Sequence, residues 1–256
     1  MYLYVYDSFL NNKKYSNLLA RIETRLTDFG IGGRILRLSP LRNTVELLND
    51  EIKNGMKTVV IVGNDKTLAH VINIISRLDI TIGIIPVGPD NKIARLLGVN
   101  SPEDACNILS ARKIESIDLG KANDTYFISS ITVDQGDVAI SCEDKFVVRP
   151  ESSNNTVGVY NLRPVFAASW GPKNLFSPRD GKLEVLIQPL KTSWWTKNKT
   201  ATGDNSIIPF EKITIRSKGK SALSVFTDGQ KILKTPVQVE VIPKKLKVVV
   251  GKDRLF

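Results

Sequence analysis

Two short polar segments of this sequence carry residue types that suit phosphate binding. The first loop is Gly63–Thr67 (GNDKT), and the second loop is Gly88–Lys92 (GPDNK). Each loop follows an apolar run and precedes residues with helical periodicity, so each is expected to join a strand to a helix. Backbone N–H groups at the beginning of a helix attract anions, so the loops are candidates for an anion site. Asp65 also has a purely structural interpretation, because an aspartate at the start of a helix is often a cap.

The elements around the loops predict that the loops lie close together. Val59–Val62 is an uninterrupted apolar run, which is typical of a strand buried on both faces of a parallel sheet. The next strand is expected at Ile82–Val87, followed by a short helix at Ile93–Leu97 that Gly98 can close. Between the two strands, apolar residues recur with the spacing of one helix face: Leu68, Val71, Ile72, Ile75 and Leu78. Successive strand-to-helix turns share the carboxyl edge of a parallel sheet, where open α/β sheets bind ligands.

The rest of the N-terminal half continues this alternation of strands and helices. Two more strands and three more helices are expected, over residues 2–6 and 34–38 and over about 15–29, 43–55 and 101–109. Asn43 with Glu46 three residues later predicts a capping box. The alternation predicts right-handed parallel crossovers, and hence an α/β domain with a parallel, doubly wound sheet over residues 1–113.

After residue 113 the pattern changes to short β-rich runs separated by turn signals. Strands are predicted at Ile114–Leu119, Tyr126–Val133, Val138–Ser141, Phe146–Arg149, Val157–Tyr160, Leu183–Ile187, Ile213–Arg216, Leu223–Phe226 and Val237–Ile242. Asp180 and Asp228 each precede a glycine, and Asp-Gly is the commonest hairpin turn, so spacing alone favours structural roles for both. Helical periodicity is absent, so residues 114–243 predict a C-terminal antiparallel β-sandwich domain.

The two loops resemble those of the diacylglycerol kinase catalytic-domain family, which read GGDGT and PxGTxNDxAR. Here the matching residues are Gly63–Thr67 and Pro86–Arg95 (PVGPDNKIAR), with similar order, spacing and flanking strands. The resemblance continues through later segments: Ile117–Lys121, Ser177–Val185, Thr227–Gln230 and Pro236–Val250. It implies an α/β nucleotide domain paired with a β-sandwich, and a last strand, at about residues 244–256, that returns to the first domain.

The resemblance also implies a function and a set of site residues. It implies an ATP-dependent lipid kinase that uses Mg²⁺ to transfer a phosphoryl group to diacylglycerol or a related lipid hydroxyl. The implied nucleotide-binding residues are Gly63, Asn64, Asp65, Lys66, Thr67, Gly88, Asn91 and Lys92. The implied metal residues are Asp65, Asp118 and Asp180, and the last two also support the base. Gln230 stands where the family has a glutamate that acts as general base.

Substitutions at these positions argue against ordinary catalysis. Asn64 and Lys66 replace glycines; asparagine tolerates a positive φ, whereas lysine would fit such a backbone path poorly. In the second loop, Pro89 removes one backbone N–H and Lys92 replaces an acid. Gln230 cannot accept a proton as a carboxylate does, and loss of a positioned base typically removes about 10²–10⁴ in rate.

The two loop lysines keep three interpretations. Lys66 and Lys92 either bind phosphate directly, or pair with Asp65 and Asp90 and so fill the site, or are simply solvated. The first interpretation compensates for lost loop amides, and the second predicts a site without free charge.

Composition bounds the partners and the location. The chain has 36 Lys and Arg against 26 Asp and Glu, a net charge of +10. This balance suits a phosphate ligand, an acidic membrane surface or nucleic acid, although no motif supports specific nucleic-acid binding; an ordinary basic surface is the plain alternative. Trp194 and Trp195, among lysines, suit an anionic lipid interface or packing on the sandwich. The sequence shows no signal peptide and no membrane-spanning run, so we expect a cytoplasmic protein with peripheral attachment at the inner membrane surface.

Three functions remain open from sequence. The first is an ATP-dependent lipid kinase, and the second is a catalytically weak or inactive relative that binds a nucleotide, a phosphate compound or a lipid headgroup. The third is an NAD kinase-type enzyme, which shares the GGDGT-like loop, but the pattern of Pro86–Arg95 favours the lipid kinase branch.

Cys106 and Cys142 are too few and too far apart for a disulfide framework or a metal cluster. Oligomeric state has no signal in these patterns.

Overall fold

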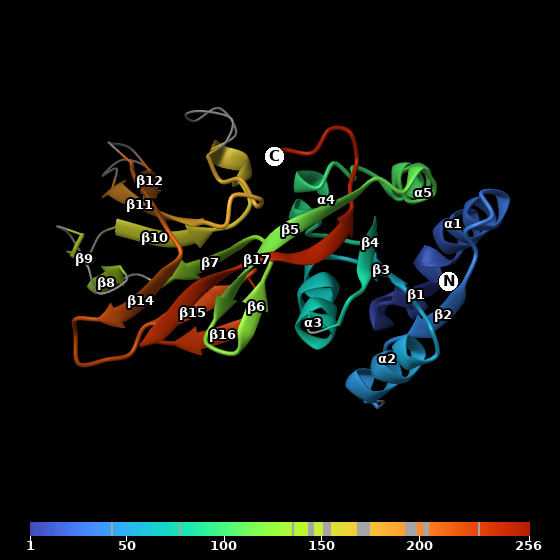
Figure 1. The fold of residues 1–256 in the computed structure, drawn as a ribbon, viewed down its shortest axis with the longest axis horizontal. Coiled ribbons are helices and arrows are strands. Elements are labelled where there is room, and N and C mark those ends of the chain that lie inside the picture. The colour runs from blue at the N-terminus through green and yellow to red at the C-terminus, as the bar shows by residue number, and fades with distance from the viewer. Residues whose placement is uncertain are drawn as a thin grey trace. The chain divides into compact units, whose positions relative to one another are not determined.

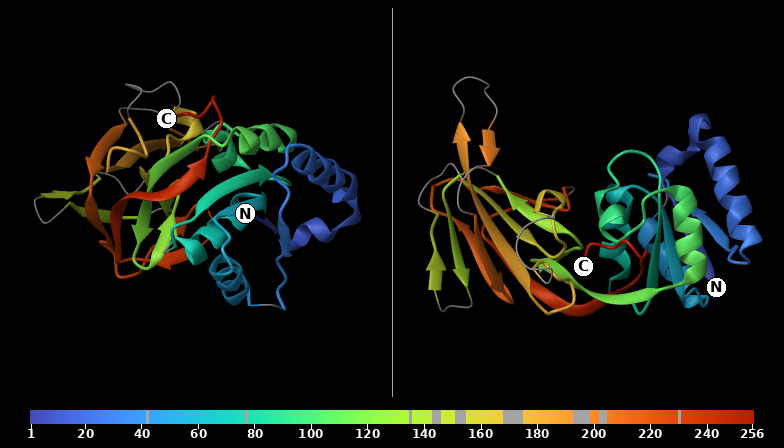
Figure 2. Two further views of the ribbon diagram at one scale, coloured as in Figure 1. Left: turned by 45° about the vertical axis from the view of Figure 1, so that its right-hand side comes forward. Right: turned by 90° about the horizontal axis from the view of Figure 1, so that it is seen from above.

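The computed structural model describes residues 1–41, 43–76, 78–134, 136–142, 146–150, 155–167, 175–192, 199–201, 205–229 and 231–256. Contacts divide the chain into two compact units. Unit 1 comprises Met1–Ile117 and Lys245–Leu255, and unit 2 comprises Asp118–Lys244 together with Phe256. Within the described residues the α-helices lie in the blue-to-green part of the chain, and the yellow-to-red part is rich in strands (Figures 1 and 2). The short yellow coil is a 3₁₀ helix, η3 (Val165–Ala167).

Unit 1 is built on a parallel sheet. Its strands are β1 (Tyr2–Tyr6), β2 (Arg34–Arg37), β3 (Thr58–Gly63) and β4 (Thr81–Pro86), in the spatial order β2-β1-β3-β4, and every neighbouring pair is parallel. All residues of β3 and β4 are buried. This burial explains their unbroken apolar sequences, because both faces of a parallel sheet are covered.

Helices cover this sheet on both faces. They are α1 (Ser16–Asp28), α2 (Thr44–Lys53), α3 (Asp65–Ile75), α4 (Lys92–Leu96) and α5 (Pro102–Ala111), with two short 3₁₀ helices, η1 (Ser8–Asn11) and η2 (Lys13–Tyr15), before α1. Helix α1 packs against α5, and α2 packs against α3. The predicted doubly wound α/β fold is therefore confirmed. None of the helices in the described ranges is long and apolar enough to span a membrane.

The predicted helix starts are largely confirmed. Asn43 caps α2 by accepting hydrogen bonds from the backbone amides of Val45 and Glu46, and Ser101 caps α5. The capping at α2 is one-sided. The reciprocal capping box occurs instead at the start of α3.

Unit 2 is antiparallel. Its strands are β5 (Ile114–Ala122), β6 (Thr125–Phe127), β7 (Ser130–Val133), β8 (Val138–Cys142), β9 (Phe146–Val148), β10 (Asn155–Tyr160), β11 (Leu183–Thr192), β12 (Lys199–Ala201), β13 (Ser206–Phe210), β14 (Lys212–Ser217), β15 (Ser224–Thr227), β16 (Lys231–Lys234) and β17 (Val237–Val249), with β5 and β17 extending into unit 1. One layer has the order β12-β11-β10-β7-β15-β16, with β13 beside β11. The other contains β17, β14, β8 and β9. Buried side chains of both layers form one hydrophobic core, as in a β-sandwich.

Strand β17 is longer than predicted. Its first half pairs antiparallel with β14, and its end pairs parallel with β4, with Lys247 opposite Thr81. The chain therefore supplies a further strand to the parallel sheet after leaving the antiparallel one.

Candidate functional site

The first loop is a tight strand-to-helix turn. Asn64 has a φ of −116° and is the N-cap of α3. Its side-chain oxygen accepts hydrogen bonds from the backbone amides of Lys66 at 3.0 Å and Thr67 at 3.3 Å, and the Thr67 hydroxyl accepts one from the Asn64 amide at 3.3 Å. The strain expected at Lys66 is absent, because this residue lies in the first turn of α3 and has no positive φ.

The end of β1 is part of the same arrangement. The Thr67 hydroxyl donates a 2.6 Å hydrogen bond to the carboxylate of Asp7, which also accepts from the backbone amide of Phe9. A Cβ on Gly63 would come within 2.5 Å of the Thr67 hydroxyl oxygen, so glycine is required for this close approach. Sequence reasoning did not single out Asp7. The signal was present, because Asp7 follows β1 as Gly63 ends the neighbouring parallel strand.

The second loop turns through two residues with positive φ. These are Gly88 at 84° and Asp90 at 60°. The Asn91 side chain donates to the Gly88 carbonyl at 2.7 Å and so closes the loop on itself. A Cβ on Gly88 would lie 2.9 Å from the ring of Phe9, so this ring covers the loop.

Asp65 joins the two loops. Its carboxylate accepts hydrogen bonds from the backbone amides of Lys92 at 2.8 Å and Ile93 at 3.2 Å, and its own amide donates to the Asp90 carbonyl at 2.9 Å. The side chain is only 7% exposed. Asp65 is therefore an acceptor for the start of α4, a helix far away in the sequence, rather than for its own helix.

These contacts change the interpretation of the loops as an anion site. First-turn amides of α3 are bonded to Asn64, and those of α4 to Asp65. The chain's own oxygen atoms thus occupy the donors that would otherwise face phosphate. Lys66 and Lys92 are exposed, and within the described part of the chain neither forms an ion pair. Among the described residues, Lys66 and Lys92 are thus two unpaired cations at the loops, and the interpretation in which they pair with Asp65 and Asp90 is not seen.

Asp118, in unit 2, is fully buried and committed to the backbone. Its carboxylate accepts from the amides of Gly181 at 2.8 Å and Lys244 at 2.7 Å, and its amide donates to the Pro178 carbonyl at 2.7 Å. Through these bonds Asp118 links the turn that carries Asp180 to the backbone of β17 at Lys244.

Asp180 lies at the surface of this turn. Its carboxylate accepts from the Lys182 amide at 3.0 Å, and Gly181 has a φ of 73°. Partial burial raises the pKa of Asp180, the bond from Lys182 lowers it, and the neighbouring Asp118 carboxylate raises it further. Asp118 and Asp180 are therefore neighbours within unit 2.

Glu184 is a third carboxylate of this group, which we did not predict. One carboxylate oxygen accepts from the Phe176 amide at 3.3 Å, and the other has no hydrogen-bond partner, although the residue is only 3% exposed. Burial raises the pKa of Glu184 to about 7, with a further contribution from the charge of Asp180 and an opposing one from Arg163. Its position between Leu183 and Val185, which face the core, predicts an outward side chain, but that face is covered.

The residues present fit a magnesium ion only in part. No group of three or more His, Cys, Asp or Glu side chains in the described ranges is placed to hold a metal ion. Mg²⁺ usually binds through one or two carboxylates, with water and phosphate oxygens completing the octahedron. Asp180 and the unpartnered oxygen of Glu184 are suitable ligands, whereas both oxygens of Asp118 already accept amide bonds.

Asp228 has a structural role, as its Asp-Gly context predicts. Its carboxylate accepts from the amides of Ile128, Ser129 and Ser130 at 2.8 to 3.0 Å. Burial raises its pKa to about 6, against the opposing effect of these three bonds.

Not all of the predicted site residues can be placed together. Gln230, Trp194 and Trp195 lie outside the described residues. Asp65 and Asn91 belong to unit 1, whereas Asp118 and Asp180 belong to unit 2. Their convergence on one site stays a prediction.

Comparison with known proteins gives consistent results. Residues 2–122 match the family model described as diacylglycerol kinase catalytic domain. A Staphylococcus haemolyticus protein named "Putative lipid kinase" is 26% identical over 244 residues, 78% of each chain. A Streptococcus pneumoniae protein of the same name is 29% identical over 229 residues, 74% of this chain and 77% of its own. The structure of a diacylglycerol kinase from Bacillus anthracis superposes with a TM-score of 0.78 over 98% of this chain and 97% of its own, at 20% identity, and so shares the fold.

Proposed function

Because residues 2–122 belong to the diacylglycerol kinase catalytic-domain family, we propose that this protein is a lipid kinase that transfers the γ-phosphoryl group of ATP to the hydroxyl group of diacylglycerol or a related lipid. The observation that carries the proposal is the family match, which includes both loops. The names of the two bacterial relatives support a lipid acceptor. Peripheral attachment to an anionic membrane surface belongs to the same proposal, because the acceptor resides there.

In this proposal the lysines of the loops bind the triphosphate. Lys66 and Lys92 are exposed cations at the starts of α3 and α4, and the backbone donors beside them are already bonded. Binding would therefore depend on side-chain charge more than on loop amides. Asp65 acts indirectly, since it holds the second loop and hence Lys92 in place.

The acidic group of unit 2 would serve the metal and the acceptor. Asp180 and Glu184 are the residues that would hold Mg²⁺, which when bound neutralises charge that develops on the transferred phosphoryl group. Asp118 positions the turn that carries Asp180. A hydroxyl group must also lose its proton during transfer, and Gln230 cannot accept it.

A second function is favoured by specific observations. The occupied amides of both loops and the glutamine at position 230 suit a catalytically weak or inactive relative that binds a nucleotide or another phosphate compound. The two functions differ in turnover and share the phosphate ligand.

A phosphorylation assay separates the two functions. It contains purified protein, Mg²⁺, radiolabelled ATP and a panel of lipid hydroxyls in mixed micelles. The lipid kinase predicts labelled phospholipid, with less product from Lys66→Ala and Lys92→Ala. Saturable ATP binding without labelled product on any lipid supports the second function instead. Absence of both binding and product would contradict both functions.

A further inference from the structure

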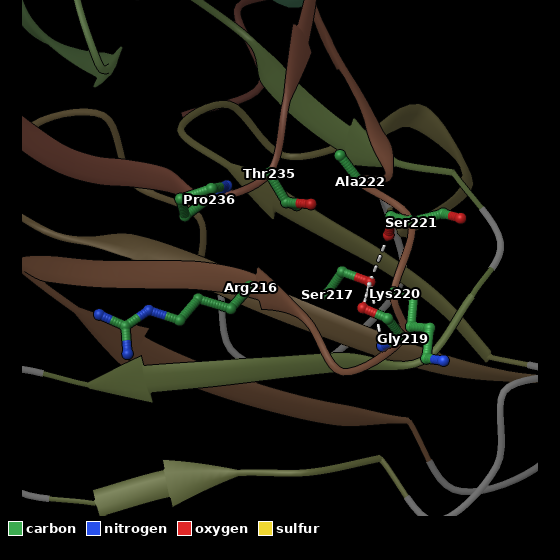
Figure 3. Close-up of a pocket in the computed structure, with 8 residues that line it drawn as sticks. All are labelled: Arg216, Ser217, Gly219, Lys220, Ser221, Ala222, Thr235 and Pro236. Atoms are coloured by element: carbon green, nitrogen blue, oxygen red, sulfur yellow. Dashed lines mark hydrogen bonds between the residues drawn. The ribbon is translucent and has the colours of Figure 1, made fainter.

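A cavity of about 290 Å³ lies in unit 2, at the turn between β14 and β15 (Figure 3). Its polar lining consists of two cations and three hydroxyl side chains: Arg216, Lys220, Ser217, Ser221 and Thr235. None of the described residues that line it is acidic. This chemistry is that of an anion site, and none of its lining residues has been assigned a role above.

The turn that forms one wall has a defined shape. The Ser217 hydroxyl donates a 2.7 Å hydrogen bond to the Ser221 carbonyl and accepts one of 3.2 Å from the Gly219 amide, as the dashed lines in Figure 3 show. Opposite, Thr235 is bonded twice to Leu223, with its amide donating to the Leu223 carbonyl and its hydroxyl accepting from the Leu223 amide, each at 3.0 Å. Both walls are therefore held by hydrogen bonds of their own.

The charge around the cavity is positive. Lys218 and Lys234 flank the lining residues and are exposed, as are Arg216 and Lys220. In the described ranges none of these four side chains forms an ion pair. Asp137 is near in the fold, because its carbonyl accepts from the Lys218 amide, but it does not line the cavity. A cluster of positive charges without nearby carboxylate partners raises the local concentration of anions.

We propose that this cavity binds a phosphate group. The ammonium group of Lys220 supplies a positive charge on the turn itself, and the hydroxyl groups of Ser221 and Thr235 supply hydrogen bonds. The Ser221 hydroxyl forms none with the described residues, since it is the Ser221 carbonyl that closes the turn. The Arg216 side chain extends along its strand, away from the turn, and contributes charge at longer range (Figure 3).

The proposal goes beyond the kinase function and does not depend on it. The phosphate of a lipid headgroup and free inorganic phosphate offer the same chemistry, so the experiment uses both probes. The full chain is titrated with inorganic phosphate against chloride at constant ionic strength, and the amide resonances of Gly219 and Ser221 are followed by NMR. In parallel, binding to vesicles of phosphatidylcholine with and without phosphatidylglycerol is measured by co-sedimentation.

Two variants and a matched control test the site. Lys218→Ala/Lys220→Ala removes two charges at the cavity, and Lys53→Ala/Lys252→Ala removes two exposed charges from unit 1. Ser221→Ala keeps the charge and removes one hydroxyl. We expect saturable shifts at Gly219 and Ser221 with phosphate, weakened about tenfold or more by the cavity double variant, since each lysine near an anionic surface contributes about fivefold. Ser221→Ala should weaken phosphate binding several-fold, and the unit 1 control should not change it.

Each outcome decides the proposal. Shifts with phosphate alone identify a free phosphate compound as the ligand, and shifts accompanied by vesicle binding that the cavity variants abolish identify a lipid headgroup. The absence of saturable shifts overturns the proposal. So does an equal loss in the cavity variant and the unit 1 control, because binding would then follow net charge rather than the cavity.

Discussion

The carboxylate of Asp65 accepts a 2.8 Å hydrogen bond from the backbone amide of Lys92, 27 residues further along the chain. Asp65 begins α3, and Lys92 begins α4, so this bond ties together two successive strand-to-helix turns. The same carboxylate also accepts from Ile93. A side chain that resembles a nucleotide or metal ligand in sequence thus has a clear structural role.

Asp65→Ala should destabilise the protein. The substitution leaves two amides at the start of α4 without an acceptor, and each unsatisfied buried donor costs about 1–3 kcal/mol. We expect a loss of about 2–4 kcal/mol in the free energy of unfolding, measured by urea denaturation. Asp65→Asn keeps one acceptor oxygen and should lose less.

Asp50→Ala is the control, because Asp50 is an exposed residue of α2. It should change the stability by less than about 0.5 kcal/mol. An equally small effect of Asp65→Ala would contradict the capping role and return Asp65 to the ligand hypothesis.

Asp118→Asn should mainly reduce thermal stability, whereas Asp180→Asn should mainly reduce lipid phosphorylation. Both oxygens of Asp118 accept backbone amides, and an asparagine would present an N–H₂ group to one of them. We therefore expect Asp118→Asn to reduce the free energy of unfolding by about 2–4 kcal/mol, which should appear as a clearly lower thermal midpoint. Asp180→Asn should leave the midpoint nearly unchanged and reduce any lipid phosphorylation. Loss of activity by Asp118→Asn at full stability would instead assign it a direct part in the reaction.

The parallel half of the fold could be predicted because its signals are local. An unbroken apolar run such as Val59–Val62 is buried at every residue, and serine or asparagine caps mark the starts of α2 and α5. These patterns reflect burial on both faces and the unpaired amides of a first helical turn. Neither depends on which distant segment lies alongside.

Strands β13 and β16 escaped prediction because local signals oppose them. Ser206–Phe210 contains Pro209, which cannot donate to a ladder and is found on edge strands, and here it pairs only with β11. Lys231–Lys234 places lysines at both ends of a largely exposed strand. Pairing with a neighbour, which composition does not encode, makes these segments strands.

The site was less predictable, because its decisive contacts are between distant segments. Asp65 binds amides at the start of α4, and Glu184 accepts a hydrogen bond from the amide of Phe176, a contact that the alternation of β11 does not reveal. The resemblance to a family pointed to the two loops as candidates, but it did not reveal that their first-turn amides are occupied.

Glu184 should make stability depend on pH. Its folded pKa of about 7 lies above its ordinary value of 4.5, so between these values the folded state binds more protons than the unfolded state. The contribution of Glu184 to stability is therefore complete below about pH 4.5 and is lost as pH rises through about 7, with an amplitude of up to about 3 kcal/mol. Glu184→Gln stays neutral throughout and should lack this loss.

Urea unfolding of both proteins between pH 5 and 8 checks the prediction. The raised pKa of Asp228, about 6, adds a dependence of the same sign, but to both proteins, so the difference between the curves isolates Glu184. Parallel curves over this range would show that Glu184 titrates as an ordinary carboxyl group.

The last prediction concerns Gln230, which stands where the resemblance to the kinase family implies a glutamate. If the missing proton acceptor is the main deficit, Gln230→Glu should raise lipid phosphorylation by about 10²-fold or more. Its rate should also rise with pH through the pKa of the new carboxyl group, a profile that Gln230→Asn, the matched control, should not show. Nucleotide binding, measured by equilibrium dialysis, should be similar in all three proteins, because Lys66 and Lys92 are unchanged.

Two results would show that the missing proton acceptor at position 230 is not the main deficit. No gain with Gln230→Glu, together with weak ATP binding, would show that the occupied loops exclude the triphosphate. Introducing Lys66→Gly and Lys92→Asp would then be the next step, although glycine in the first turn of α3 costs about 1 kcal/mol of helix stability.

Rapid phosphorylation by the unmodified protein, insensitive to Gln230→Ala, would show that another carboxylate accepts the proton. Glu184, with one unpartnered oxygen and a pKa of about 7, is then the first to replace. Loss of turnover in Glu184→Gln at unchanged binding of both ATP and Mg²⁺ would identify it as the base, whereas weakened Mg²⁺ binding would return it to the role of a metal ligand.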